Sequence, residues 1–163
     1  MAMKKKMAVK KAKSDAVVKV ALLGFGTVGG SVARVLGASK FPGVELTHIF
    51  NRNVERKRRS DAAKFVSGSV VWTEDVEDVL RSDVDVVVEL MGGLNPTEGW
   101  IRKALASGKS VVTANKQLIA YRGAGLAKLA GETGVGTELE KLGKVLEEVK
   151  WFPNLNCAAT YKT

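Results

Sequence analysis

The sequence has very few of the residues that build metal clusters and disulfide frameworks. Its 163 residues include one cysteine, Cys157, and one histidine, His48. A single cysteine excludes an internal disulfide, and a zinc site built from cysteines and histidines needs more ligands than these two residues supply. No apolar run reaches the roughly 20 residues of a membrane-spanning helix. We therefore expect a protein without a metal site or a membrane span, and a cytoplasmic location as the default.

Negative charge is scarce near the amino terminus. The first fifteen residues contain six lysines and one aspartate, and they supply five of the nine formal positive charges of the chain. We expect residues 1–15 to form a solvated, disordered tail. The alternative is a contact with nucleic acid or another anionic surface. No aromatic stacking motif accompanies the lysines, so nucleic-acid binding is the weaker hypothesis.

Apolar, β-branched runs alternate with helical patterns after this tail. The runs are continuously apolar, which is typical of strands covered on both faces. This alternation predicts the α/β class, a doubly wound parallel sheet of the Rossmann type with right-handed crossovers. The predicted strands span residues 17–24, 44–50, 69–72, 84–90 and 110–113, and the predicted helices span residues 31–39, 74–82, 96–108 and 124–134.

The first strand ends in the glycine-rich stretch "GFGTVGG" at residues 24–30. Gly24, Gly26 and Gly29 form a G-x-G-x-x-G pattern between a strand and a helix, which is the context of a dinucleotide-binding loop. Gly24 would permit the tight turn, Gly26 would let a pyrophosphate approach the backbone, and Gly29 would let the helix pack closely. The alternative is a purely structural turn. We expect Gly30 to lie against a neighbouring strand.

The end of the second strand predicts which dinucleotide binds. An NAD-binding loop usually carries an acid here for the ribose 2′-hydroxyl. The sequence "NRNVERKRR" instead offers Arg52, whose guanidinium can fork onto a 2′-phosphate, and Lys57, which can add a second positive charge. We therefore expect NADP as the cofactor, with NAD as the second possibility. Alternatively, these cations only form a solvated loop face.

Two later strand ends complete the pattern. "VVVELMGG" ends a strand in Gly92 and Gly93, and "VVTANKQL" ends the next strand near Lys116. Both ends lie at the edge of the sheet where ligands bind. Near a nicotinamide, Lys116 could hydrogen-bond a substrate hydroxyl or carbonyl oxygen and help move its proton. A lysine in this position is otherwise an ordinary surface residue.

Three motifs in this order resemble the amino-terminal dinucleotide-binding domain of the homoserine dehydrogenases. The motifs are G-F-G-T-V-G, the strand end E-L-M-G-G, and T-A-N-K, within a resemblance that covers about residues 17–131. The resemblance implies a Rossmann-type fold and the NAD(P)-dependent interconversion of L-homoserine and L-aspartate 4-semialdehyde. That reaction belongs to the aspartate pathway, which leads to threonine, methionine and isoleucine.

The resemblance also implies roles for individual residues. It places cofactor contacts at Phe25, Thr27 and Val28 of the glycine loop. It places Gly92 and Gly93 beside the nicotinamide end of the cofactor. It makes Lys116 both a cofactor neighbour and the candidate catalytic lysine. The cations at the end of the second strand fit the NADP-selective members of the family.

The sequence from residue 134 onward does not resemble the family. Residues 137–149 show an amphipathic helical pattern, with Thr137 as a candidate N-cap. We therefore expect a basic tail at residues 1–15, a dinucleotide-binding domain at 16–133, and a divergent helix and tail at 134–163. The substrate domain of the family, through which its members dimerise, is not recognisable, so the dimer is not carried over.

Two functions follow from these expectations. The first is an oxidoreductase of the homoserine dehydrogenase type in truncated form, with a small-molecule substrate. The second is a stand-alone NADP-binding module without turnover. Binding a dinucleotide requires only the nucleotide domain, whereas hydride transfer requires a second wall that orients the substrate and excludes water.

Overall fold

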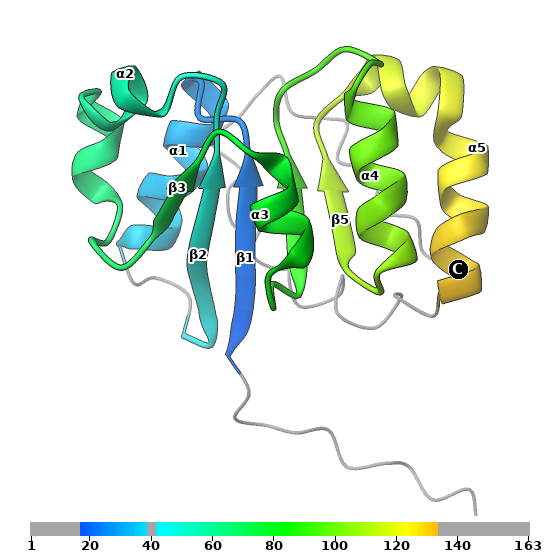
Figure 1. The fold of residues 1–163 in the computed structure, drawn as a ribbon, viewed down its shortest axis with the longest axis horizontal. Helices are drawn as coiled ribbons and strands as arrows, with labels where there is room; N and C mark the ends of the chain where they lie inside the picture. Colours follow the sequence, from blue (N-terminus) through cyan, green and yellow to red (C-terminus); the bar gives the residue numbers. More distant parts are fainter. Residues whose placement is uncertain (1–16, 39–41, 134–163) are drawn as a thin grey trace, which may run out of the picture.

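The computed structural model describes residues 17–38 and 42–133, which form one open sheet with helices on both sides (Figure 1). The tail predicted at residues 1–15 and the helix predicted at residues 137–149 lie outside the described residues. Within the described part, no helix combines the length and apolar character needed to cross a membrane.

Five parallel strands form the sheet in the order β3-β2-β1-β4-β5. The central strand β1 pairs with β2 on one side and with β4 on the other, so the strand order reverses between β1 and β4. This arrangement confirms the predicted doubly wound sheet. The strands are β1 (Val18–Leu23), β2 (Val44–Phe50), β3 (Val71–Thr73), β4 (Val86–Glu89) and β5 (Ser110–Thr113).

Helices cover the two faces of the sheet. In Figure 1, α3 and α4 lie in front of the strands, α1 lies behind them, and α5 runs beside α4. The short helix η1 packs on α1. The helices are α1 (Thr27–Gly37), α2 (Val54–Arg58), η1 (Asp61–Phe65), α3 (Val76–Arg81), α4 (Thr97–Ala106) and α5 (Lys116–Thr133).

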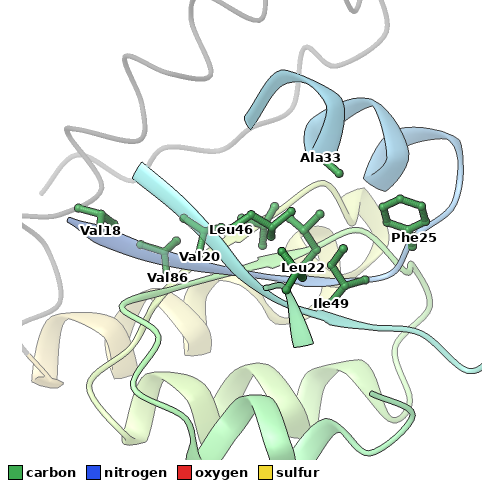
Figure 2. Packing of buried hydrophobic residues seen from close by; sticks show 10 residues of the cluster. Val18, Val20, Leu22, Phe25, Ala33, Leu46, Ile49 and Val86 are labelled. Atoms are coloured by element: carbon green, nitrogen blue, oxygen red, sulfur yellow. The ribbon is translucent and has the colours of Figure 1, made fainter. Parts of the chain in front are cut away.

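The central strand contributes side chains to a core on each face. Val20 and Leu22 pack on the α1 side, where Figure 2 shows Leu22 close to Phe25 and Ile49. Ala21 and Leu23, which alternate with them along the strand, pack on the α3 and α4 side. Burying an aliphatic or aromatic side chain of this size stabilises the fold by about 1.5–3 kcal/mol. Burial on both faces explains why β1 is continuously apolar.

Helix α5 begins eight residues before the start predicted from the sequence. The prediction began at residue 124, whereas α5 begins at Lys116. Its first turn is capped by Asn115, whose side-chain oxygen accepts the N–H of Leu118 at 3.0 Å. The predicted helix was therefore too short, because Asn115 and Lys116 were predicted to lie at the end of a strand, whereas β5 ends at Thr113 and Asn115 caps the helix.

Two short helices, α2 and η1, were not predicted. Each spans five residues and buries none of its side chains, so neither shows the apolar periodicity of a helix. Helix η1 also corrects the expectation for Gly30. A Cβ at Gly30 would lie 2.7 Å from the Cβ of Ala62, so this glycine lies against η1 and not against a strand.

Candidate functional site

The loops after β1, β2, β4 and β5 share the carboxyl edge of the sheet, at the top of the view in Figure 1. Backbone hydrogen bonds join their first residues. The N–H of Gly24 donates to the carbonyl oxygen of Phe50 at 2.9 Å, and the N–H of Leu90 donates to that of Leu23 at 2.9 Å. Ligands of doubly wound sheets bind at this edge, beside the point where the strand order reverses.

The three glycines of the first loop occupy different environments. Gly24 has φ +107°, a conformation that favours glycine, and a Cβ there would lie 2.9 Å from Cγ of Met91. A Cβ at Gly29 would lie 2.2 Å from the carbonyl oxygen of Gly24, so only glycine fits. A Cβ at Gly26 would meet nothing within 4 Å. The loop is therefore tightly packed at Gly24 and Gly29 and open at Gly26.

The amino terminus of α1 is left without a side-chain cap. Gly26 occupies the N-cap position, and the first turn contains no acidic residue. By contrast, the side chains of Asn53 and Asp75 cap α2 and α3 by accepting backbone N–H groups of those helices. An uncapped helix start offers N–H groups and a partial positive charge to an anion, which suits a phosphate beside the open space at Gly26.

The other residues of this loop differ in how they can reach a ligand. Phe25 as a whole residue is 2 % exposed, and its ring packs edge-on against Trp72, with ring centroids 4.7 Å apart. It therefore belongs to the core, and its side chain does not reach towards a ligand. Thr27 is exposed and Val28 is half-buried in the first turn of α1. These two residues leave both backbone and side chain available to a bound molecule.

The loop after β2 presents unpaired cations. Arg52 is exposed and Lys57 is half-buried, and within the described residues the charged group of neither side chain forms an ion pair or a hydrogen bond. The one acid in this segment, Glu55, pairs with Arg59. Asn53 is used locally, since its side-chain oxygen accepts the N–H of Arg56 at 3.0 Å. Arg52 and Lys57 can therefore receive an anionic group without first losing a protein partner.

The loop after β4 is organised by a buried carboxylate. Glu89 is the last residue of β4 and is 0 % exposed. Its Oε1 accepts the N–H groups of Met91, at 2.7 Å, and Gly92, at 2.9 Å, and its Oε2 accepts the hydroxyl of Thr113. Gly92 and Gly93 have φ +77° and +75°, and a Cβ at either would meet nothing within 4 Å. Their backbone is thus open towards the edge of the sheet.

The loop after β5 is tied to the same two glycines. The side-chain nitrogen of Asn115 donates to the carbonyl oxygen of Gly93 at 2.6 Å, and its backbone N–H donates to Oγ1 of Thr113 at 3.0 Å. Lys116 follows as the first residue of α5. It is exposed, and its ammonium group has no partner within the described ranges. The lysine is therefore free to contact a ligand at this edge.

Ion pairs fix α5, which begins at Lys116, against α4. Oε1 of Glu98 lies 2.9 Å from Nη2 of Arg102, and its Oε2 lies 2.9 Å from Nε of Arg122 on α5. The hydrogen bonds from Arg102 and then from Arg122 hold the pKa of the Glu98 carboxyl below its usual value. A pair of guanidinium groups on one carboxylate is geometrically demanding and therefore orients the two helices relative to each other.

The structure brings most of the predicted site residues to one edge. The glycine loop touches the β4 loop through Met91, and the β4 loop contacts the β5 loop through Asn115. Arg52 and Lys57 follow β2, whose last residue, Phe50, bonds to Gly24 of the glycine loop. Glu89 and Asn115 were missed as site residues. The available signal was an acid at the end of the apolar run 84–90, where burial of a charge requires hydrogen-bonding partners.

Two other features do not contribute to this site. Residues 17–38 and 42–133 contain no group of three histidine, cysteine or acidic side chains that could hold a metal ion. A hollow of about 360 Å³ lies at the opposite, amino edge of the sheet, where Val44 and Phe65 are among its lining residues. It is separated from the glycine loop by the length of the strands.

Comparison with known sequences gives one consistent result. The chain matches the family described as "Homoserine dehydrogenase, NAD binding domain" over residues 24–140. It is 37 % identical over 125 residues to the homoserine dehydrogenase of Bacillus subtilis and 41 % identical over 128 residues to that of Corynebacterium glutamicum. These matches cover 72 % and 76 % of this chain but only 28 % of each relative.

Solved structures give the same result. A crystal structure of Staphylococcus aureus homoserine dehydrogenase superposes with a TM-score of 0.65 and 36 % identity, and the match covers 74 % of this chain and 31 % of that one. The structure of GenD2 from gentamicin A biosynthesis, in complex with NAD, superposes with a TM-score of 0.61 and 28 % identity. That match covers 80 % of this chain and 36 % of GenD2.

Proposed function

Because this chain belongs to the homoserine dehydrogenase family and carries its NAD-binding domain, we propose that it binds a nicotinamide dinucleotide at the carboxyl edge of the sheet. We further propose that it acts as the cofactor-binding part of a homoserine dehydrogenase. The single observation that carries this proposal is the open space at Gly26 in front of the uncapped start of α1. A phosphate placed there meets N–H donors and no Cβ.

The rest of the cofactor follows from the order of the loops. The pyrophosphate would lie on residues 24–29, with the backbone of Phe25 and the first turn at Thr27 and Val28 as further contacts. The nicotinamide half would lie across the switch point, beside Gly92 and Gly93. Both glycines leave space for an approaching group, because neither has a neighbour where a Cβ would stand.

NADP is the proposed form of the cofactor. The end of β2 lies where the adenosine ribose binds in Rossmann folds. Arg52 and Lys57 supply two unpaired positive charges there. Of the acids beside this loop, Glu55 is paired with Arg59, and the carboxylate of Glu74 accepts the N–H of Val54 at 2.8 Å. A 2′-phosphate would gain charge-assisted hydrogen bonds from these cations, whereas the bare 2′-hydroxyl of NAD has no charge to pair with them.

The proposed reaction interconverts L-homoserine with NADP⁺ and L-aspartate 4-semialdehyde with NADPH and a proton. When bound, the nicotinamide accepts or donates the hydride. Lys116 would lie at the substrate oxygen, where its amine accepts the proton of the homoserine hydroxyl in one direction and its ammonium returns a proton in the other. The hydrogen bonds of Asn115 hold the start of α5, and with it Lys116, next to the Gly93 backbone.

The chain spans little more than a quarter of the length of the curated relatives that it matches. This observation favours a second candidate function, NADP binding without turnover by the chain alone. The two candidates separate in one assay, in which the purified chain is mixed with NADP⁺ and L-homoserine and the absorbance of reduced nicotinamide is followed. Homoserine-dependent reduction supports the enzyme, whereas saturable NADPH binding without reduction supports the binding module.

A further inference from the structure

The loops after β4 and β5 are joined by a closed ring of hydrogen bonds. Glu89 accepts the Gly92 N–H and the Thr113 hydroxyl, Thr113 accepts the Asn115 N–H, and Asn115 donates to the Gly93 carbonyl. The covalent bond between Gly92 and Gly93 closes the ring. From this geometry we infer that Glu89 is a positioning residue, which fixes the nicotinamide-side backbone at Gly92 and Gly93 relative to the start of α5. The inference rests on the proposed function.

The chemistry of Glu89 is unusual for the end of a core strand. The preceding residues of β4 are valines, and Val86 and Val87 are 0 % exposed. An apolar side chain at position 89 would fill the same space without the cost of removing a carboxylate from water. The carboxylate is retained with three donors, and two of them are loop groups, the N–H groups of Met91 and Gly92. The ring therefore organises the loop more than it stabilises the strand.

The ring also sets the position of Lys116. This lysine is one residue beyond Asn115, whose side chain bonds to Gly93 at 2.6 Å and to the N–H of Leu118 at 3.0 Å. Asn115 thus joins the glycine backbone and the first turn of α5 through a single side chain. A change at Glu89 would release Gly92 and Thr113 together, and the spacing between the Gly93 backbone and Lys116 would no longer be fixed.

The test separates the two halves of the cofactor. Adenosine 2′,5′-bisphosphate carries the 2′-phosphate but no nicotinamide, so its affinity reports on the β2 end and the glycine loop alone. NADPH also reports on the nicotinamide half, through its affinity and the fluorescence of the bound ring. Glu89→Gln keeps the size of the side chain and removes its charge. Thr113→Val removes the hydroxyl, and Thr113→Ser retains it.

Thr73 provides the matched control. It ends β3 as Thr113 ends β5, and its Oγ1 accepts the N–H of Asp75 at 2.9 Å, as Oγ1 of Thr113 accepts that of Asn115. Thr73→Val removes the same local turn contact without touching Gly92 or the ring.

We expect Glu89→Gln and Thr113→Val to weaken NADPH binding about tenfold and to change the fluorescence of the bound ring. Both variants should bind the bisphosphate as wild type does, and Thr113→Ser should restore NADPH binding. Thr73→Val should leave the fluorescence of the bound ring unchanged. Equal loss of both ligands, or no loss of either, would overturn the role of Glu89. A wild-type chain that binds neither ligand would instead contradict the proposed function itself.

Discussion

A Cβ on Gly29 would lie 2.2 Å from the carbonyl oxygen of Gly24. The start of α1 therefore packs so closely on the end of β1 that only the hydrogen atom of a glycine fits between them. Gly26 lies between these two glycines in the sequence, and a Cβ on Gly26 would meet no atom within 4 Å. Gly29 is therefore required by the fold itself, whereas Gly26 is required only if a ligand approaches the backbone.

This contrast predicts different effects of alanine at the two positions. Gly29→Ala must displace the loop, and we expect it to lower the free energy of unfolding by about 1–3 kcal/mol and to abolish cofactor binding. Gly26→Ala has room and φ −86°, so its stability should stay within about 0.5 kcal/mol of wild type. Its NADPH affinity should fall at least about tenfold. Urea unfolding and NADPH titration measure both quantities. Wild-type affinity in Gly26→Ala would contradict the proposed phosphate position.

Replacing Arg52 with aspartate tests the origin of NADP selectivity. The variant should lose about 1.5–3 kcal/mol of NADPH binding, which is the range of a charge-assisted hydrogen bond, and should bind NADH as before. Arg58→Asp makes the same change of charge in the same segment. If both variants lose NADPH affinity equally, the selectivity comes from the overall positive field and not from contacts of Arg52.

We predict that Lys116 contributes to the rate of the reaction and not to the stability of the fold. Its side chain is exposed and has no partner within the described part of the chain, so Lys116→Met should unfold at the wild-type temperature. Homoserine-dependent reduction of NADP⁺ should fall by about 10²–10⁴-fold, the usual contribution of a general acid or base. Thermal unfolding and steady-state rates are the measurements. Retention of the full rate would remove Lys116 from the proton transfer.

The contact between α4 and α5 should weaken in acid. The pKa of Glu98 is lowered in the folded state by Arg102 and Arg122. A carboxyl whose pKa is lower in the folded state than in the unfolded state stabilises the fold. For Glu98 this stabilisation is complete above the ordinary pKa of about 4.5, and it is lost as the pH falls through the pKa of the folded state. Glu98→Gln should therefore unfold at a lower temperature than wild type at neutral pH, and the difference should disappear in acid. Unfolding temperatures of the two proteins from neutral pH to pH 3 would show this convergence. A constant difference across the range would contradict it.

The sheet was predictable because its strands are continuous apolar runs. The predicted bounds of β2 and β5 equal the observed ones, Val44–Phe50 and Ser110–Thr113. Helix α1 begins earlier than predicted, at Thr27, because its first turn consists of the glycine motif and lacks apolar periodicity. Helix α2 was missed because its start depends on the Asn53 cap rather than on a buried face.

The candidate site was predictable only in part. Glycine loops and strand ends carry local sequence signals, so Gly24, Gly26 and Lys116 could be named from the sequence. The ring through Glu89 could not, because Glu89 and Thr113 are 24 positions apart and meet only when β4 and β5 pair in register. The burial of Phe25 was also hidden, since its contact with Trp72 requires β3 to lie beside β2.

The most direct test of the account is a titration of the purified chain with NADPH and, separately, with NADH, followed by the fluorescence of the reduced nicotinamide. We predict saturable binding of NADPH, with a dissociation constant at least about tenfold below that of NADH, as expected from one or two charge-assisted contacts to the 2′-phosphate. Absence of saturable binding for both dinucleotides would contradict the central claim that the edge between β1 and β4 holds a nicotinamide cofactor.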